Sequence, residues 1–126
     1  MSIVPTQAAG SPPGKRILVV EDEAVIAVDY YFQLREVGAI PKAYEPTNKA
    51  ALDYLSEHEI DAAIVDYRLR DGPSDPVLQR LQRLGIPFIV VSGCLHEMHG
   101  SVGTSQVLSK PATPDEVWRA LSKVLQ

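Results

Sequence analysis

The sequence predicts an α/β protein built on a doubly wound, five-stranded parallel sheet with the strand order 2-1-3-4-5. Short apolar runs alternate with amphipathic segments of helical period along the chain. These runs are apolar at consecutive positions, as is typical of parallel strands covered by helices on both faces. Most of the runs end directly before a polar residue, and in open parallel sheets ligands bind at the carboxyl ends of the strands.

The first half of the domain contains three of the predicted strands. Residues 16–20 form a buried strand before an acidic stretch, residues 39–43 a weaker one, and residues 62–65 a third. Between them, Gly38 ends one helical pattern and Thr47 caps the next. The apolar stripes of these two helices are Ile26, Tyr30, Leu34 and Val37, and then Ala51, Leu52 and Leu55.

The second half supplies the remaining strands and two further helices. Residues 74–76, Ser-Asp-Pro, favour a helix start, and Gly85 favours its end. Residues 87–91 and 106–109 are the fourth and fifth strands, and residues 113–116 form a capping box with proline at the first helical position. The apolar stripes of these helices are Val77, Leu78, Leu81 and Leu84, and then Val117, Leu121 and Val124.

Two segments lack a clear pattern. Residues 1–14 contain several prolines and glycines without apolar periodicity, so we expect a flexible tail before a domain that spans residues 15–126. Residues 95–105 should contain a helix between the last two strands. Gly100 and Gly103 weaken it, because glycine disfavours a helix interior, and we expect a short, irregular or mobile segment.

Composition narrows the classes of function. The 126 residues suffice for one domain, and a net charge of −4 argues against a surface that binds nucleic acid through its phosphates. The single cysteine, Cys94, cannot form an internal disulfide. No apolar run approaches the roughly 20 residues that span a bilayer, and no secretory signal is evident. We expect a cytoplasmic protein with neither a nucleic-acid nor a membrane partner.

Reactive residues follow four of the five predicted strands. Glu21 and Asp22 come after the first strand, Asp66 ends the third, Ser92 follows the fourth, and Lys110 follows the fifth. Because the carboxyl ends of parallel strands meet at one edge of the sheet, these side chains should converge. The sequence therefore predicts a single pocket that contains three carboxylates, a hydroxyl and an ammonium group.

This set of groups suits phosphoryl transfer. Three carboxylates in one cleft repel each other, and Mg²⁺ relieves the repulsion because it prefers oxygen ligands and keeps several waters. Phosphoryl transfer mainly requires positioning and neutralisation of the phosphoryl oxygens. Asp66 would be the nucleophile, while Lys110 and Ser92 would supply a positive charge and a hydroxyl.

Four segments carry these residues in order: Ile-Leu-Val-Val-Glu-Asp-Glu at 17–23, Ala-Ala-Ile-Val-Asp at 62–66, Val-Val-Ser-Gly at 90–93 and Leu-Ser-Lys-Pro at 108–111. Together they resemble the receiver domains of bacterial response regulators in two-component signalling, which have a flavodoxin-like fold. The resemblance covers about residues 15 to 126. A single such motif would be weak evidence, but four in the right order, each closing a predicted strand, are specific.

The resemblance implies a role for each residue. Asp66 would be the phosphoacceptor, and Lys110 and Ser92 would hold the phosphoryl oxygens. The peptide bond between Lys110 and Pro111 would be cis. The implied Mg²⁺ ligands are Asp22, Asp66 and the backbone carbonyl of Arg68, with Glu21 acting through a metal-bound water.

The resemblance also implies the class of function. The chain would be a stand-alone response regulator that is phosphorylated by a sensor histidine kinase or a histidine phosphotransfer protein. It would act by contact with a downstream protein, or as a phosphate shuttle or sink. Such a protein is a signalling switch rather than a metabolic enzyme, since it catalyses only its own phosphorylation and dephosphorylation.

Two positions depart from the family pattern. Val107 stands three residues before Lys110, where receivers usually have a tyrosine or phenylalanine switch, so the signal would be relayed differently or hardly at all. Arg70 replaces a proline that often follows the phosphoacceptor. The stretch from Asp66 to Gly72 instead resembles receivers, many of them free-standing, that are paired with alphaproteobacterial-type kinases.

The sequence leaves three other classes of protein to consider. A pseudo-receiver would bind proteins without being phosphorylated, and Val107 is compatible with it. A small Mg²⁺-dependent phosphatase or nuclease of the haloacid dehalogenase or Toprim type would need an acid two residues after Asp66, where this chain has Arg68. A flavodoxin would need a phosphate-binding loop where this chain has acidic residues 21–23.

A second apolar stripe lies on the first predicted helix, outside its core stripe. It consists of Val25, Val28 and Phe32 at helical spacing. Incidental exposure is one interpretation of this stripe, and a docking surface for the phosphorylating partner is the other.

Overall fold

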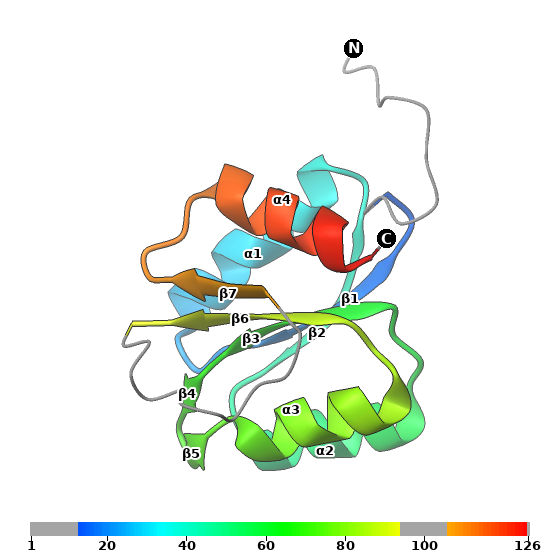
Figure 1. Ribbon diagram of the computed structural model, residues 1–126, viewed down its shortest axis with the longest axis vertical. Helices are drawn as coiled ribbons and strands as arrows, with labels where there is room; N and C mark the ends of the chain where they lie inside the picture. The colour runs from blue at the N-terminus through cyan, green and yellow to red at the C-terminus, as the bar shows by residue number, and fades with distance from the viewer. Residues whose placement is uncertain (1–12, 94–105, 126) are drawn as a thin grey trace.

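The computed structural model describes residues 13–93 and 106–125, and its centre is a five-stranded sheet (Figure 1). The strands are β1 (Arg16–Val20), β2 (Ile40–Glu45), β3 (Ala62–Asp66), β6 (Phe88–Ser92) and β7 (Gln106–Ser109). They lie in the order β2-β1-β3-β6-β7, and every neighbouring pair is parallel. The predicted fold class and strand order are confirmed.

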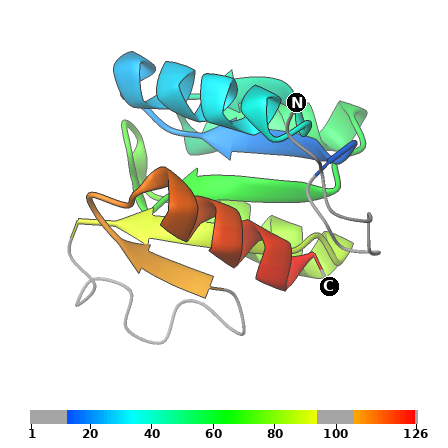
Figure 2. The same cartoon turned by 90° about the horizontal axis from the view of Figure 1, so that it is seen from above.

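Helices cover both faces of the sheet, as the apolar runs predict. On one face lie α1 (Ala24–Glu36) and α4 (Pro114–Val124), and on the other lie α2 (Asn48–Glu57) and α3 (Asp75–Leu84) (Figures 1 and 2). The expected irregular segment at 95–105 and most of the expected tail lie outside the described residues, as do Cys94 and residue 126. Within the described ranges no helix combines the length and apolarity that a membrane crossing requires.

The central strands contribute alternate side chains to two apolar layers. Val19 and Ile64 pack with α1 and α4, whereas Leu18 and Val65 pack with α2 and α3. The edge strand β2 differs because it has only one neighbour. Its residues alternate between exposed and half-buried, and it runs over Ile40–Glu45 rather than the predicted 39–43.

The predicted helix ends are largely confirmed. The Thr47 hydroxyl accepts a hydrogen bond from the Ala50 N–H at 3.0 Å, and Thr113 and Glu116 form the complete capping box of α4. At α3 two details differ from the prediction. Ser74 precedes the helix but makes no side-chain cap, and Leu84 is 49% exposed rather than part of the core stripe.

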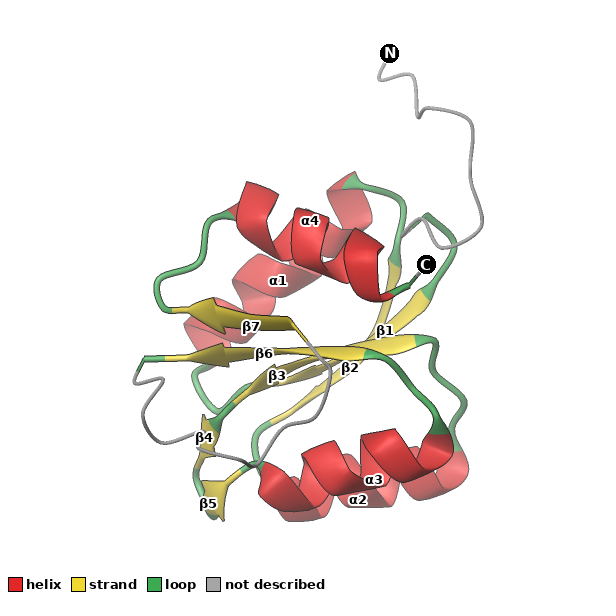
Figure 3. Cartoon of the chain, viewed as in Figure 1, coloured by secondary structure: helices red, strands yellow, loops and turns green. Residues whose placement is uncertain are grey.

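A two-stranded antiparallel ribbon follows β3 and was not predicted. It consists of β4 (Arg68–Leu69) and β5 (Gly72–Pro73), joined by the two-residue turn of Arg70 and Asp71. Gly72, which follows the turn, has φ +119°, a value that side chains disfavour. The ribbon lies beyond the carboxyl end of β3 and begins two residues after Asp66 (Figure 3).

The opposite end of the sheet is held by an ion pair between the starts of β1 and β3. The carboxylate of Asp61 accepts from the Arg16 backbone N–H at 2.7 Å and from two guanidinium nitrogens at 3.1 Å each. The side-chain hydrogen bond from Arg16 is the main reason that the pKa of Asp61 lies below its usual value. This pair fixes the alignment of the two central strands that carry Asp66 and the first acids.

We expect Asp61→Asn to lower the melting temperature at neutral pH by a few degrees, because the bidentate charged acceptor is lost. A depressed folded-state pKa stabilises the fold above the unfolded-state pKa, and this stabilisation disappears as the pH falls through the folded value. The difference between variant and wild type should therefore vanish in strong acid. Thermal unfolding across pH tests it, with Glu59→Gln as the control, since Glu59 is 90% exposed and 3.6 Å from Arg16. An equal loss at all pH values would contradict the assignment.

Candidate functional site

The carboxyl ends of the strands bring the predicted side chains together. Glu21 follows β1 and is 1% exposed, and Asp66 ends β3 and is 6% exposed. Ser92 ends β6 and is also buried, while Lys110 directly follows β7. Because β1, β3, β6 and β7 are consecutive neighbours in the sheet, residues far apart in sequence meet at one edge.

Three carboxylates cluster at this edge. Glu21, Asp22 and Asp66 each offer an oxygen, and these oxygens all lie within 4.8 Å of one another. The Lys110 ammonium lies 3.2 Å from Asp66 Oδ2 and 3.6 Å from Glu21 Oε1. Lys110 thus lies close to both buried acids, and Asp22 occupies the more exposed side of the cluster.

The electrostatics of the cluster follow from burial. Burial, followed by the charge of Asp66, raises the pKa of Glu21 to about 7, although the Glu23 N–H and Lys110 partly oppose this rise. Burial also raises the pKa of Asp66, against the lowering effect of Lys110. Burial alone would lower the pKa of Lys110, but the charges of Asp66 and Glu21 raise it above its usual value. The ammonium is therefore firmly charged, while full ionisation of its acidic neighbours is disfavoured.

The donor set fits a hard divalent cation. Three carboxylates face one ammonium, so complete ionisation leaves a surplus of negative charge at this edge. Glu21 Oε1 is buried and has no hydrogen-bond partner among the described residues. Carboxylate and carbonyl oxygens are the ligands that Mg²⁺ prefers, and it commonly completes its shell with water. The cluster of Glu21, Asp22 and Asp66 could hold such an ion.

The segment around Lys110 is held against the neighbouring strand. The Lys110 backbone N–H donates to the Ser92 carbonyl at 2.8 Å, which continues the pairing of β7 with β6. The peptide bond between Lys110 and Pro111 is cis, as the resemblance implies.

Sequence reasoning missed the contacts that Arg70, Asp71 and Tyr30 make around this edge of the sheet. The Arg70 guanidinium donates to the Asp22 carbonyl at 3.2 Å, and Asp71 bonds to the start of α2. The Asp-Gly pair formed by Asp71, in the turn, and Gly72, directly after it, is a hairpin signal that could have located this ribbon. The core stripe of the first helix includes Tyr30, which is indeed buried. The charges of Glu21 and Asp66 also affect its hydroxyl. Burial first, and then these charges, raise the pKa of its hydroxyl.

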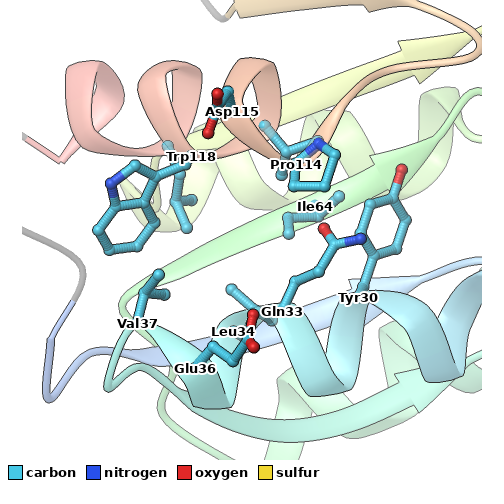
Figure 4. A pocket seen from close by; sticks show the side chains of 11 residues that line it. Tyr30, Gln33, Leu34, Glu36, Val37, Ile64, Pro114, Asp115 and Trp118 are labelled. Carbon is cyan, nitrogen blue, oxygen red and sulfur yellow. The ribbon is translucent and has the colours of Figure 1, made fainter. Parts of the chain in front are cut away.

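A separate cleft between α1 and α4 contains none of the acids of the cluster. Its volume is about 280 Å³. Figure 4 shows Trp118 on α4 facing Val37 at the end of α1, with Gln33 and Tyr30 along the α1 wall. Trp118 is half-buried.

The known proteins that this chain resembles are solved structures. Neither the protein-family models nor the curated proteins gave a match. A response regulator receiver protein from Sinorhizobium medicae WSM419 superposes with a TM-score of 0.81 at 25% identity, over 89% of this chain and 94% of that one. SdrG from Sphingomonas melonis Fr1 is 35% identical with a TM-score of 0.78, over 90% of this chain and 98% of that one. This chain belongs to the response regulator receiver family.

Receiver domains also form parts of larger proteins. The response regulator PhyR from Brucella abortus matches 93% of this chain with a TM-score of 0.78 and 24% identity, which shows the shared fold. This receiver spans 50% of that PhyR chain. Membership of the family supports a role of the response-regulator type in signalling rather than in metabolism.

Proposed function

We propose that this receiver accepts a phosphoryl group on Asp66 from a histidine-phosphorylated partner while Mg²⁺ is bound beside it. The observation that carries the proposal is the pairing of Asp66 with Lys110 at 3.2 Å within the cluster of three carboxylates. Asp66 is the clustered acid nearer to the ammonium, since Glu21 Oε1 lies 3.6 Å from it. A carboxylate with a cation on each side suits attack on a phosphoryl group.

The reaction balances without a redox partner. A carboxylate oxygen of Asp66 attacks phosphorus, and the bond between phosphorus and the donor imidazole nitrogen breaks. The nitrogen keeps the electron pair and takes up a proton, which leaves a neutral histidine and an aspartyl phosphate. Attack of water on phosphorus later restores the Asp66 carboxylate and releases phosphate. Both steps require mainly in-line positioning and compensation of negative charge.

Each neighbour has a role in this scheme. Lys110, which now pairs with Asp66 Oδ2, would pair with a phosphoryl oxygen of the product. The Ser92 hydroxyl would donate to another phosphoryl oxygen. Asp22, Asp66 and the Arg68 carbonyl would hold Mg²⁺ directly, with Glu21 acting through a water. When bound, Mg²⁺ neutralises charge on the phosphoryl oxygens and relieves the repulsion within the cluster.

The partner in the proposal is a sensor histidine kinase or a histidine phosphotransfer protein. The predicted second stripe on α1 is exposed: Val25 by 81%, Phe32 by 61%, and Val28 to a smaller extent. Exposed apolar side chains that gather on one helix suit contact with another protein. We assign this stripe to the phosphorylating partner, and we propose that the phosphorylated receiver acts on a downstream protein or serves as a phosphate shuttle or sink.

The pseudo-receiver is the second candidate, and Val107 is the observation that favours it. Val107 lies on β7 and is partly exposed at the position where the family usually has an aromatic switch. A phosphatase is less well supported, because Arg68 occupies the position where that class needs an acid. A pseudo-receiver would not incorporate phosphate at all. A single phosphorylation assay therefore separates it from the proposed phosphoacceptor.

We expect incubation with a small phosphoramidate donor and Mg²⁺ to add one phosphate, detected by intact-protein mass. Chelation of the metal should abolish the addition, and so should Asp66→Asn. Asp61→Asn is the matched control, because it removes a carboxylate from the other end of the same strand region and should leave phosphorylation intact. Phosphate on Asp66→Asn, or none on the wild type with any donor, would contradict the proposal.

We expect Phe32→Ala to slow phosphotransfer from the cognate partner about tenfold, because truncation of an interface anchor commonly costs more than 1 kcal/mol. Transfer from the small donor should be unchanged, since the cluster is not altered. Rapid-quench kinetics with both donors test this. Leu84→Ala is the control, because Leu84 is also apolar and exposed but lies at the end of α3, on the opposite face of the sheet. Equal transfer rates for both variants and the wild type would contradict the docking role, and the stripe on α1 would then be only incidentally exposed.

A further inference from the structure

The turn between β4 and β5 makes hydrogen bonds to two other parts of the protein. Arg70 donates to the Asp22 carbonyl at 3.2 Å, so the turn contacts the loop between β1 and α1. Asp71 contacts the first residues of α2. The ribbon thus bridges the first acidic loop and a helix on one face of the sheet, directly after Asp66 (Figure 1).

Asp71 makes an unusually complete set of contacts for an exposed carboxylate. Its Oδ1 accepts from the Asn48 backbone N–H at 2.8 Å and from the Asn48 side-chain amide at 3.2 Å, and its Oδ2 accepts from the Lys49 N–H at 3.2 Å. The amide of Asn48, which is 7% exposed, also donates to the Pro73 carbonyl at 2.9 Å. The start of α2 therefore holds the turn and the second strand of the ribbon together.

The base of the ribbon is closed by a second set of bonds. The Ser74 N–H donates to the Tyr67 carbonyl at 2.7 Å, and the hydroxyl of the buried Tyr67 donates to Asp75 at 3.0 Å. Arg68, whose backbone carbonyl is the third protein ligand of the proposed metal site, lies between this base and the turn. The position of that carbonyl is fixed by the ribbon, and the ribbon is fixed at its tip by Asp71.

Asp71 shares the capping of α2 with Thr47, and it does so from the turn of the ribbon. The Thr47 hydroxyl already caps α2 by accepting from Ala50. Asp71 adds bonds to the N–H groups of Asn48 and Lys49, which would otherwise have no partner within the helix. These bonds hold the pKa of Asp71 below its usual value, so the carboxylate is ionised at the positive end of the helix dipole.

We propose that Asp71 is a positioning residue for the metal site, because it anchors the ribbon that presents the Arg68 carbonyl. This inference rests on the proposed Mg²⁺ site. Asp71 acts through the ribbon and does not itself touch the cation. Residues behind the metal ligands commonly affect affinity about 10–100-fold when they are replaced.

The test compares Asp71→Ala with two matched variants by calorimetric titration with MgCl₂. Asp71→Ala should weaken Mg²⁺ binding about tenfold. Thr47→Ala removes the other cap of the same helix, and Asp53→Asn removes an exposed charge one turn along α2. Both should bind Mg²⁺ like the wild type. Asp22→Asn, which alters a proposed ligand, should lose binding altogether.

A metal-free measurement reports on the ribbon itself. In Asp71→Ala the Ser74 amide, which bonds across the base of the ribbon, should exchange with deuterium faster than in the wild type and in Thr47→Ala. Unchanged exchange, or an equal loss of Mg²⁺ affinity in Asp71→Ala and Thr47→Ala, would overturn the inference. If Asp71→Ala binds Mg²⁺ as tightly as the wild type does, the inference about Asp71 is overturned, but the proposed function is not. No Mg²⁺ binding by the wild type would overturn the metal site and this inference together.

Discussion

Burial of the Glu21 and Asp66 carboxylates beside Lys110 is the interaction on which the rest of the site depends. Removing carboxylates from water is costly unless they gain compensating partners. Lys110 provides one positive charge for three clustered acids, and burial raises the pKa of Glu21 to about 7. Negative charge at this edge of the sheet is therefore only partly compensated. A surplus of negative charge suits a site that binds a cation and then a phosphoryl group.

The sheet order makes this concentration of charge possible. Neighbouring parallel strands deliver Glu21, Asp66 and Ser92 to the same edge, and the hydrogen bond from Lys110 to the Ser92 carbonyl continues that edge beyond β7. The strand ends place these side chains directly. The backbone after Asp66 is different, because it enters a ribbon of two short strands that does not pair with the main sheet. Its bonds to α2 and to the first acidic loop take the place of sheet pairing.

The sequence was sufficient for the parts of the molecule that depend on local patterns. Apolar runs located the central strands, and the residues that close them predicted the cluster, including Lys110, from strand-end position alone. Contacts between distant loops were not predictable in this way. The bond of Arg70 to Asp22 and the attachment of Asp71 to Asn48 depend on how the ribbon folds back, which neither periodicity nor composition encodes. Tyr30 shows the same limit, since a helical stripe assigns it to the core but not to the neighbourhood of Glu21.

The central claim is that this acidic edge holds a divalent cation directly beside Asp66. The most direct measurement is an anomalous difference map from crystals soaked in Mn²⁺, which shares the oxygen preference of Mg²⁺ and scatters anomalously. The account predicts one strong peak in contact with the carboxylates of Asp22 and Asp66 and with the Arg68 carbonyl. No peak at this edge, or a peak that Asp66 does not contact, would contradict it.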